Sequence, residues 1–302
     1  MSKRTGIMLP KMFTEKAFDR LPKPVLVQAK IEGDRMRTKM GSSVVGDVKM
    51  LSSGGKERTS VPHIYDELRE LISGTRIKYI EPDGELYCHG MRHSEIRSIV
   101  SRTKNIHPDH KKIKYYIYDL VATDPQIKRL ELLKGMFSKL RSFNGTKYVS
   151  RFKYIRYVPY TIVHTLEEMQ LMYDSYLKAG YEGIIIRHAT ARYKRRKVST
   201  MLKLKPRVSR HFKIVGFVEE VSKAGAPKDT LGAFMCLTDD GQMFSVGTGV
   251  TDSQRKYVWV NRDLFIDKYV KIRFQDYTKA RNVPKMQSVD KQWADEYTTP
   301  LT

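Results

Sequence analysis

The chain is poor in cysteine, with only Cys88 and Cys236 among its 302 residues. Two cysteines so far apart exclude a disulfide framework and a cysteine-based zinc site. Apolar runs of membrane-spanning length are also missing, so no membrane association is expected. Lys3 and Arg4 are not followed by an apolar stretch, which argues against a secretory signal. These absences favour a protein of the reducing cytoplasm.

Acidic residues are the second shortage. The chain has 33 Asp and Glu against 56 Lys and Arg, which gives a formal net charge of +23. A field of this sign attracts polyanions, of which nucleic acid is the commonest. An acidic membrane surface is the competing partner, but the sequence has no long basic amphipathic helix. The charge therefore favours nucleic acid, and 40% apolar residues over 302 positions are enough to fill two domains.

A lysine at the end of an apolar segment is the most distinctive local feature. Residues 24–27 predict a strand that delivers Lys30 to its end, and Glu32, Gly33 and Arg35 follow shortly after. An amine attacks only when it is neutral, so a nucleophilic lysine needs burial or cationic neighbours that lower its pKa. Glu32 is suited to orient the amine, and Arg35 to bind a phosphate or a ribose. A surface lysine in an exposed turn is the alternative interpretation of this stretch by itself.

Two carboxylates stand at predicted strand ends. Glu85 follows an Asp-Gly turn. A carboxylate there is suited to bind a ribose hydroxyl or a metal-bound water. The alternative is that Glu85 is a plain surface residue. A helix predicted from Thr165 to Gly180 leads directly into Glu182 and the apolar strand 184–186. A carboxylate at that buried edge needs a lysine or a divalent cation as its partner.

Aromatic and basic residues mark two further strands. Tyr118 lies in the aromatic run 114–121, where it is either a core residue or a ring that stacks on a purine. Strict alternation over 201–205 puts Lys203 and Lys205 on one face of a strand. Two lysines on one face repel each other unless an anion lies between them, although an exposed edge strand guarded by lysine has the same pattern.

The pattern changes after Pro206. One helix is predicted at 252–260, and short strands recur around it at 212–218, 232–237, 243–246 and 269–274. Several short strands in so small a segment predict a closed barrel of the oligonucleotide-binding (OB) type. We therefore predict a first domain at 1–207 and a second at 208–302, with a hinge at 206–210.

Taken in order, these motifs resemble those of the ATP-dependent DNA ligases, a family of covalent nucleotidyltransferases. The similarity spans nearly the whole chain and is strongest to compact bacteriophage-type enzymes with a catalytic domain and a barrel. The implied fold class is α+β, with an ATP-grasp-like nucleotidyltransferase domain of antiparallel sheets and helices followed by a small all-β OB-fold barrel. The motifs are Lys30-Ile31-Glu32-Gly33-Asp34-Arg35, Asp83-Gly84-Glu85-Leu86, Tyr118-Asp119, Glu182-Gly183, Lys203-Leu204-Lys205, Phe244-Ser245-Val246-Gly247-Thr248-Gly249, Asp252-Ser253-Gln254-Arg255 and Arg281-Asn282-Val283-Pro284.

The resemblance implies a ping-pong reaction. Lys30 attacks the α-phosphate of ATP, which is the AMP donor. The lysyl-AMP then passes AMP to the 5′-phosphate of a nick, and the 3′-hydroxyl seals the strand. Lys203 and Lys205 join Lys30 as catalytic residues, and Mg²⁺ is bound through Glu85 and Glu182. The implied nucleotide-binding residues are Gln28 through its neighbouring backbone, Lys30, Arg35, Glu85, Tyr118, Glu182, Lys203, Lys205 and Arg281.

Two positions depart from the family pattern. Glu32 replaces the usual aspartate of the first motif, and residues 52–55 lack the arginine of the family's Ser-Arg-x-Gly. An RNA ligase and an mRNA-capping guanylyltransferase share the lysine motif, and a non-catalytic nucleic-acid-binding relic is the alternative outside enzymes. The expected partner is nicked double-stranded DNA in replication, repair or recombination, bound by a monomer, in the host cell's cytoplasm if the chain is viral.

Overall fold

The chain folds into two units, residues 1–205 and residues 206–302. The structure is a computed structural model that describes residues 6–40, 48–73, 81–139, 141–143, 148–222, 224–274, 276–278, 282–285 and 287–298. In this described part of the chain, no helix is both long enough and apolar enough to cross a membrane.

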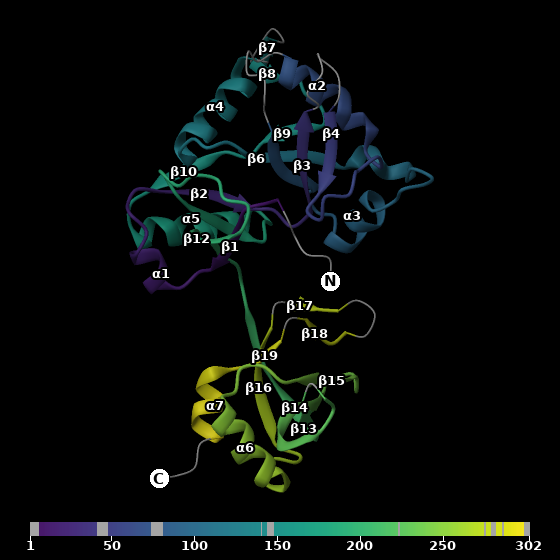
Figure 1. The fold of residues 1–302 in the computed structure, drawn as a ribbon, viewed down its shortest axis with the longest axis vertical. Helices are drawn as coiled ribbons and strands as arrows, with labels where there is room; N and C mark the ends of the chain where they lie inside the picture. Colours follow the sequence, from purple (N-terminus) through teal and green to yellow (C-terminus); the bar gives the residue numbers. More distant parts are fainter. Residues whose placement is uncertain are drawn as a thin grey trace. The chain divides into compact units, whose positions relative to one another are not determined.

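The first sheet of unit 1 carries the predicted nucleophile at the end of a central strand. Val25, Leu26 and Val27 of this strand, β2 (Val25–Lys30), are completely buried. Successive side chains of a strand point to opposite faces, so both faces of the sheet are covered at this position. Helices α1 (Glu15–Asp19) and α5 (Leu166–Lys178) pack on the sheet (Figure 1). The strand order is β1 (Leu9–Met12), β12 (Lys197–Leu204), β11 (Gly183–His188), β2 (Val25–Lys30) and β10 (Tyr160–Val163), antiparallel except for the pair β1–β12.

The second sheet of unit 1 holds the remaining motifs of the catalytic region. Its order is β4 (Val48–Ser52), β3 (Asp34–Met40), β5 (Pro82–Tyr87), β6 (Lys114–Leu120) and β9 (Ile155–Tyr157). Leu68, Leu86 and Ile117 are fully buried in the core that this sheet shares with its helices. The surrounding elements are η1 (Pro62–Ile64), α2 (Tyr65–Ser73), α3 (His93–Val100), η2 (Pro108–Lys112), α4 (Gln126–Lys139), β7 (Arg141–Phe143) and β8 (Tyr148–Ser150).

The boundaries of α5 set the position of the strand that follows it. The Thr165 hydroxyl accepts a hydrogen bond from the Glu168 N–H at 3.1 Å, which confirms the predicted start. Gly180 has a φ of +81°, the left-handed conformation that commonly ends a helix. The chain then enters β11 at once, so Glu182 stands at the mouth of that strand as predicted.

The second unit contains one five-stranded antiparallel sheet (Figure 1). Helix α6 (Asp252–Val260) lies where the sequence predicts it, whereas β13 begins at Val208 and takes in part of the predicted hinge. The sheet order is β15 (Met243–Val246), β14 (Pro227–Leu237), β13 (Val208–Val221), β16 (Tyr269–Phe274) and β19 (Ser288–Val289). The unit also contains the short elements η3 (Arg262–Leu264), β17 (Asp276–Tyr277) and β18 (Pro284–Lys285).

This unit differs from the predicted closed, all-β barrel in two respects. In the described residues no strand ladder joins the sheet edges β15 and β19, because β19 is only two residues long. A backbone hydrogen bond of 2.8 Å from Val289 N–H to the Thr248 carbonyl bridges that side instead. A second helix, α7 (Lys291–Tyr297), buries Trp293 in the core and adjoins α6 (Figure 1).

Candidate active site

Strand pairing brings three of the predicted motifs together at one end of the first sheet. Lys30, the last residue of β2, faces Gly183 on β11, and the Glu182 N–H donates to the Lys30 carbonyl at 3.1 Å. Lys203 lies on β12, which pairs with the other side of β11. Gly183 has a φ of +144°, and a β-carbon there would collide with the Leu204 carbonyl oxygen. Glycine is therefore required for this close approach of the strands.

Lysines surround the single carboxylate of Glu182. One of its oxygens binds Lys30, and the other lies 3.1 Å from Lys205 Nζ. Burial opposes ionisation of Glu182, but Lys30 and Lys205 hold its pKa below the usual range. Burial lowers the pKa of Lys203, and the nearby Lys205 and Lys30 lower it further. Three ammonium groups against one carboxylate leave a formal +2 charge, which suits an anion such as a phosphate.

The partner of Lys30 differs from one sequence expectation. Glu32 is predicted to orient the amine, but its side chain is exposed, and the ion pair of Lys30 is with Glu182. The physical reason is the antiparallel register of β2 and β11, which brings Glu182 to the end of β2, whereas Glu32 lies beyond that end.

Arg35 on β3 is fixed by a buried carboxylate. Its Nε donates to Asp83 at 2.9 Å, its Nη2 also binds Asp83, and its Nη1 donates to the Met8 carbonyl at 2.7 Å. Nη2 lies 3.4 Å from the hydroxyl of Tyr193, which donates to Asp83 at 2.6 Å. Burial alone lowers the pKa of Arg35, but Asp83 raises it well above its ordinary value. The contacts of Arg35 with described residues use four of the five guanidinium N–H groups and leave one Nη1 hydrogen without a hydrogen bond to those residues.

Glu85 is a carboxyl group that stays protonated at neutral pH. Burial raises its pKa to about 8, against the opposing effect of Arg35. The Tyr118 hydroxyl donates to Glu85 Oε2 at 3.4 Å. A β-carbon at Gly33 would collide with the Leu86 carbonyl oxygen and lie 2.8 Å from Glu85 Cγ. The glycine of the first motif thus lets the chain after Lys30 pack directly against this carboxyl group.

Gln28 and Tyr118 join the two sheets. The Gln28 amide nitrogen donates to the carbonyl oxygens of Tyr118 and Val158 at 3.2 and 3.1 Å, and its oxygen accepts from Arg187 Nε at 2.8 Å. The Tyr118 ring centroid lies 5.6 Å from the Arg35 guanidinium and 5.5 Å from that of Arg187. The Gln28 side chain is therefore committed to protein contacts, which leaves only the neighbouring backbone for the predicted adenine contact.

A buried polar network behind the site has no role assigned from the sequence. Asp119 is completely buried and binds Arg129 Nε at 2.9 Å, Arg187 Nη1 at 3.1 Å and the Gln126 amide at 3.0 Å. Two guanidinium groups on one carboxylate leave a formal +1 charge in the interior. The signal in the sequence is a charged residue directly after an apolar run in the same predicted strand, as at Arg187 after residues 184–186.

Most of the predicted site residues lie in unit 1 within these contacts. They are Gln28, Lys30, Arg35, Glu85, Tyr118, Glu182, Lys203 and Lys205. Arg281 lies outside the described residues. The chemical role of each of these residues stays a prediction.

Known families and relatives match both units. Residues 7–205 match the family model described as ATP dependent DNA ligase domain, and residues 224–290 match DNA ligase OB-like domain. The DNA ligase of African swine fever virus (strain Badajoz 1971 Vero-adapted) is 25% identical in an alignment of 241 positions, which covers 77% of this chain and 51% of the relative. The DNA ligase of Enterobacteria phage T6 is 22% identical in an alignment of 314 positions including gaps, which covers 90% of this chain and 64% of the relative. The chain thus spans about half the length of the viral relative.

Solved structures share the fold. Pmar-Lig_Pre superimposes with a TM-score of 0.77 at 20% identity, covering 95% of this chain and 67% of its own. A structure from a study of DNA binding by Lig E DNA ligases has a TM-score of 0.68 at 17% identity. The alignment covers 94% of this chain and 98% of that structure's chain. The ATP-dependent DNA ligase from bacteriophage T7 in complex with ATP has a TM-score of 0.54 at 17% identity. The alignment covers 94% of this chain and 97% of the T7 enzyme's chain. The predicted fold class, a nucleotidyltransferase domain followed by an OB-type domain, is confirmed. Because the ligase-domain model spans residues 7–205, more than half of the sequence, the protein belongs to the family of ATP-dependent DNA ligase domains.

Proposed function

We propose that this chain is an ATP-dependent DNA ligase that seals nicks in duplex DNA through a covalent lysyl-AMP intermediate. The observation that carries the proposal is the cluster in which Lys30 stands among Glu182, Lys203 and Lys205. Transfer of a nucleotidyl group to lysine requires a nucleophilic amine beside a cationic phosphate site, and this cluster supplies both. A module that only binds nucleic acid has no evident use for the carboxylate at its centre.

In the proposed first step, the neutral Lys30 Nζ attacks the α-phosphorus of ATP. A P–N bond forms, the bond to the bridging oxygen of pyrophosphate breaks, and pyrophosphate leaves. Glu182 pairs with the Lys30 ammonium and orients the amine. The proton that Lys30 loses before the attack passes to solvent water. Lys203 and Lys205 neutralise the charge that develops on the α-phosphate oxygens.

Two further displacements complete the reaction. A 5′-phosphate oxygen of the nick attacks the lysyl-AMP, which breaks the P–N bond and returns Lys30 as an amine. The 3′-hydroxyl then attacks the activated 5′-phosphate, forms the phosphodiester bond and releases AMP. Both steps again move charge onto phosphate oxygens within reach of the same lysines.

The nucleoside end of ATP is assigned to the second sheet. Arg35 keeps one N–H for a ribose oxygen, and the protonated Glu85 offers a hydroxyl donor at neutral pH. The Tyr118 ring is assigned to stacking on the adenine base. The backbone beside Gln28 is assigned to hydrogen bonding with the edge of the same base. Arg281 of the second unit is assigned to the first step.

Mg²⁺ is the proposed metal. Magnesium in proteins is usually held by one or two carboxylates together with the phosphates of a substrate. Glu182 is ionised, and the positive charge of a bound cation would favour loss of the Glu85 proton, so both residues would then serve as carboxylate ligands. The described residues contain no group of three metal-binding His, Cys, Asp or Glu side chains, which agrees with a cation that needs the nucleotide for its site. When bound, the cation supplies charge neutralisation at the phosphate oxygens.

The proposed partner is nicked double-stranded DNA, bound by a monomer in the cytoplasm of the host cell. The formal charge of +23 supports a phosphate-backbone partner. We also propose that the nucleotidyltransferase domain ends at residue 207 and that the OB-type domain occupies 208–302, because β13 of the second unit begins at Val208.

The test is covalent labelling of the purified chain. Incubation with Mg²⁺ and α-³²P-ATP should give a labelled protein band on a denaturing gel, and nicked DNA should discharge it with formation of a sealed strand. Lys30→Ala should remove the band, whereas Lys128→Ala, a change at an exposed lysine of α4, should keep it. Both variants should keep the circular dichroism spectrum of the parent.

The other outcomes discriminate between enzyme classes. A band formed with GTP alone would indicate a capping guanylyltransferase, and discharge only by nicked RNA would indicate an RNA ligase. A band that persists in Lys30→Ala would refute the assignment of the nucleophile. No band from folded, AMP-free protein would leave a DNA-binding relic.

A further inference from the structure

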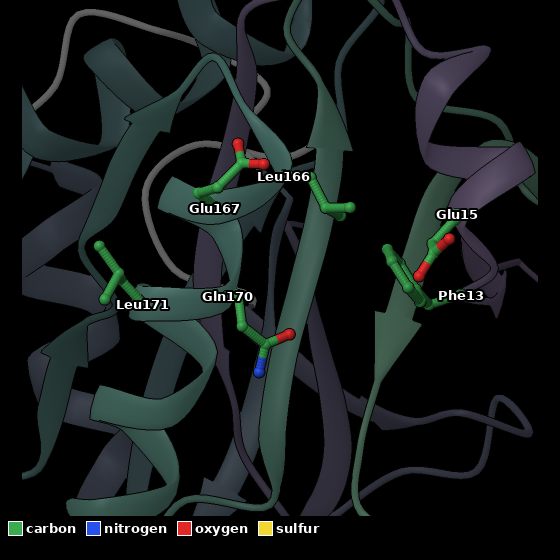
Figure 2. A pocket seen from close by; sticks show the side chains of 6 residues that line it. All are labelled: Phe13, Glu15, Leu166, Glu167, Gln170 and Leu171. Atoms are coloured by element: carbon green, nitrogen blue, oxygen red, sulfur yellow. The ribbon is translucent and has the colours of Figure 1, made fainter.

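We propose that a groove between α1 and α5 binds a short basic segment of a partner protein through an apolar anchor. The groove encloses about 480 Å³, within the usual range of about 300–1,000 Å³ for ligand sites. Figure 2 shows Phe13 and Glu15 on one side and the residues of α5 on the other. None of the lining residues belongs to the candidate active site. They are Phe13, Glu15, Leu166, Glu167, Gln170 and Leu171.

The floor of the groove is continuous with the hydrophobic core. Phe13 and Leu166 are partly buried and pack against the core cluster of the first sheet, which fixes their positions. Leu171 on the rim is 70% exposed and extends the apolar surface of Phe13 and Leu166 toward solvent. A fixed apolar floor with an exposed apolar rim is suited to an inserted aromatic or aliphatic side chain.

The charge of the groove is opposite to that of the protein. Both of its charged lining residues, Glu15 and Glu167, are acidic, in a chain with 56 basic and 33 acidic residues. Hydrogen bonds from its own backbone and from Thr165 lower the pKa of Glu167, so this carboxylate stays ionised at neutral pH. Both glutamates lie in the first turns of helices, where a negative charge also stabilises the helix.

This charge pattern selects the occupant. The two carboxylates of the groove oppose the phosphates of DNA and attract a cationic side chain. A segment with lysine or arginine around an apolar anchor is attracted to both glutamates once it comes within the Debye length of about 8 Å. The groove therefore fits a basic, apolar peptide segment of another protein.

The experiment uses a defined peptide and the full chain. The probe is a fluorescein-labelled synthetic peptide with a central Trp-Leu pair and three lysines on each side, and binding is followed by fluorescence anisotropy. We expect saturable binding with a Kd in the range of about 10–100 μM, as for small transient contacts. A peptide with two serines in place of Trp-Leu should bind about tenfold more weakly, and so should a peptide with glutamates in place of the lysines.

Variants of the chain locate the binding. Glu15→Lys combined with Glu167→Lys should weaken binding about tenfold or more, because attraction becomes repulsion. Leu171→Ser should weaken it about fivefold through lost apolar contact. The matched controls make the same kinds of change on α4. They are Glu131→Lys and Leu132→Ser, and Leu132 is 40% exposed. Their Kd for the peptide should stay within about twofold of that of the parent.

Each contrary outcome overturns the proposal. Absence of saturable binding by the parent chain, or equal weakening by the α4 control, would exclude a groove-specific site. Equal binding of the glutamate peptide would refute the charge argument. Self-association of the parent that Leu171→Ser abolishes would assign the groove to a second copy of the chain. Labelling with ATP should be unchanged in every variant, which separates loss of the groove from loss of the fold.

Discussion

Replacing Glu85 with glutamine tests the buried carboxyl group at the centre of the candidate site. The exchange keeps the shape of the side chain and removes its ionisation. In the folded chain the pKa of Glu85 is raised from 4.5 to about 8, mainly by burial. The folded state thus binds a proton more tightly than the unfolded state. The contribution of this group to stability is greatest below pH 4.5, and it falls as the pH rises from 4.5 to 8.

The size of the effect follows from that pKa difference. A carboxyl group shifted this far lowers the free energy of unfolding by up to about 5 kcal/mol above pH 8, relative to an unperturbed group. Glu85 keeps some solvent contact, so we expect about half of this value, 2–3 kcal/mol. We therefore compare the melting temperature of unit 1 in Glu85→Gln with that in the parent. The difference in favour of the variant should be roughly 5–10 °C larger at pH 9 than at pH 5.

The assay is thermal unfolding of nucleotide-free protein, followed by circular dichroism at pH 5 and pH 9. Comparison of variant with parent cancels the other titrating groups, since both proteins contain them. Glu131→Gln on the exposed surface of α4 is the control and should give the same difference at both pH values. If the effect of Glu85→Gln is also independent of pH, the reasoning about a protonated Glu85 is refuted. The variant should in addition lose labelling by ATP, because the proposed metal and ribose contact is removed.

Two further substitutions test the buried polar network around Asp119 and the close contact between Gly33 and the Leu86 carbonyl. Asp119→Asn should lower stability by about 3–5 kcal/mol in urea unfolding, because two buried arginines lose their carboxylate. The exposed Asp174→Asn should have almost no effect, and equal losses would contradict the network. Gly33→Ala should reduce both stability and labelling, because a β-carbon there meets the Leu86 carbonyl. Gly135→Ala has open space within α4 and should stabilise the helix by about 0.5–1 kcal/mol, so a loss there would contradict the steric argument.

Local patterns predicted several elements correctly. The capping pattern at Thr165 and the glycine at 180 bound α5, and the helix at 252–260 is α6. These features depend on hydrogen bonds between residues a few positions apart, so the sequence near them is sufficient. The short strand β19 and helix α7 were not predicted, because their positions depend on contacts with β16 and with the core of unit 2.

The sequence by itself determined the residue types of the candidate site and their order, because a nucleophilic amine, cationic phosphate contacts and strand-end carboxylates are recognisable from local spacing. Only the tertiary structure decided which of them meet. The register of β2 and β11 pairs Lys30 with Glu182 instead of Glu32, and burial between two sheets keeps Glu85 protonated at neutral pH. Pairings of this kind join residues more than a hundred positions apart, and the depth of burial depends on the whole core, so neither can be read from a local pattern.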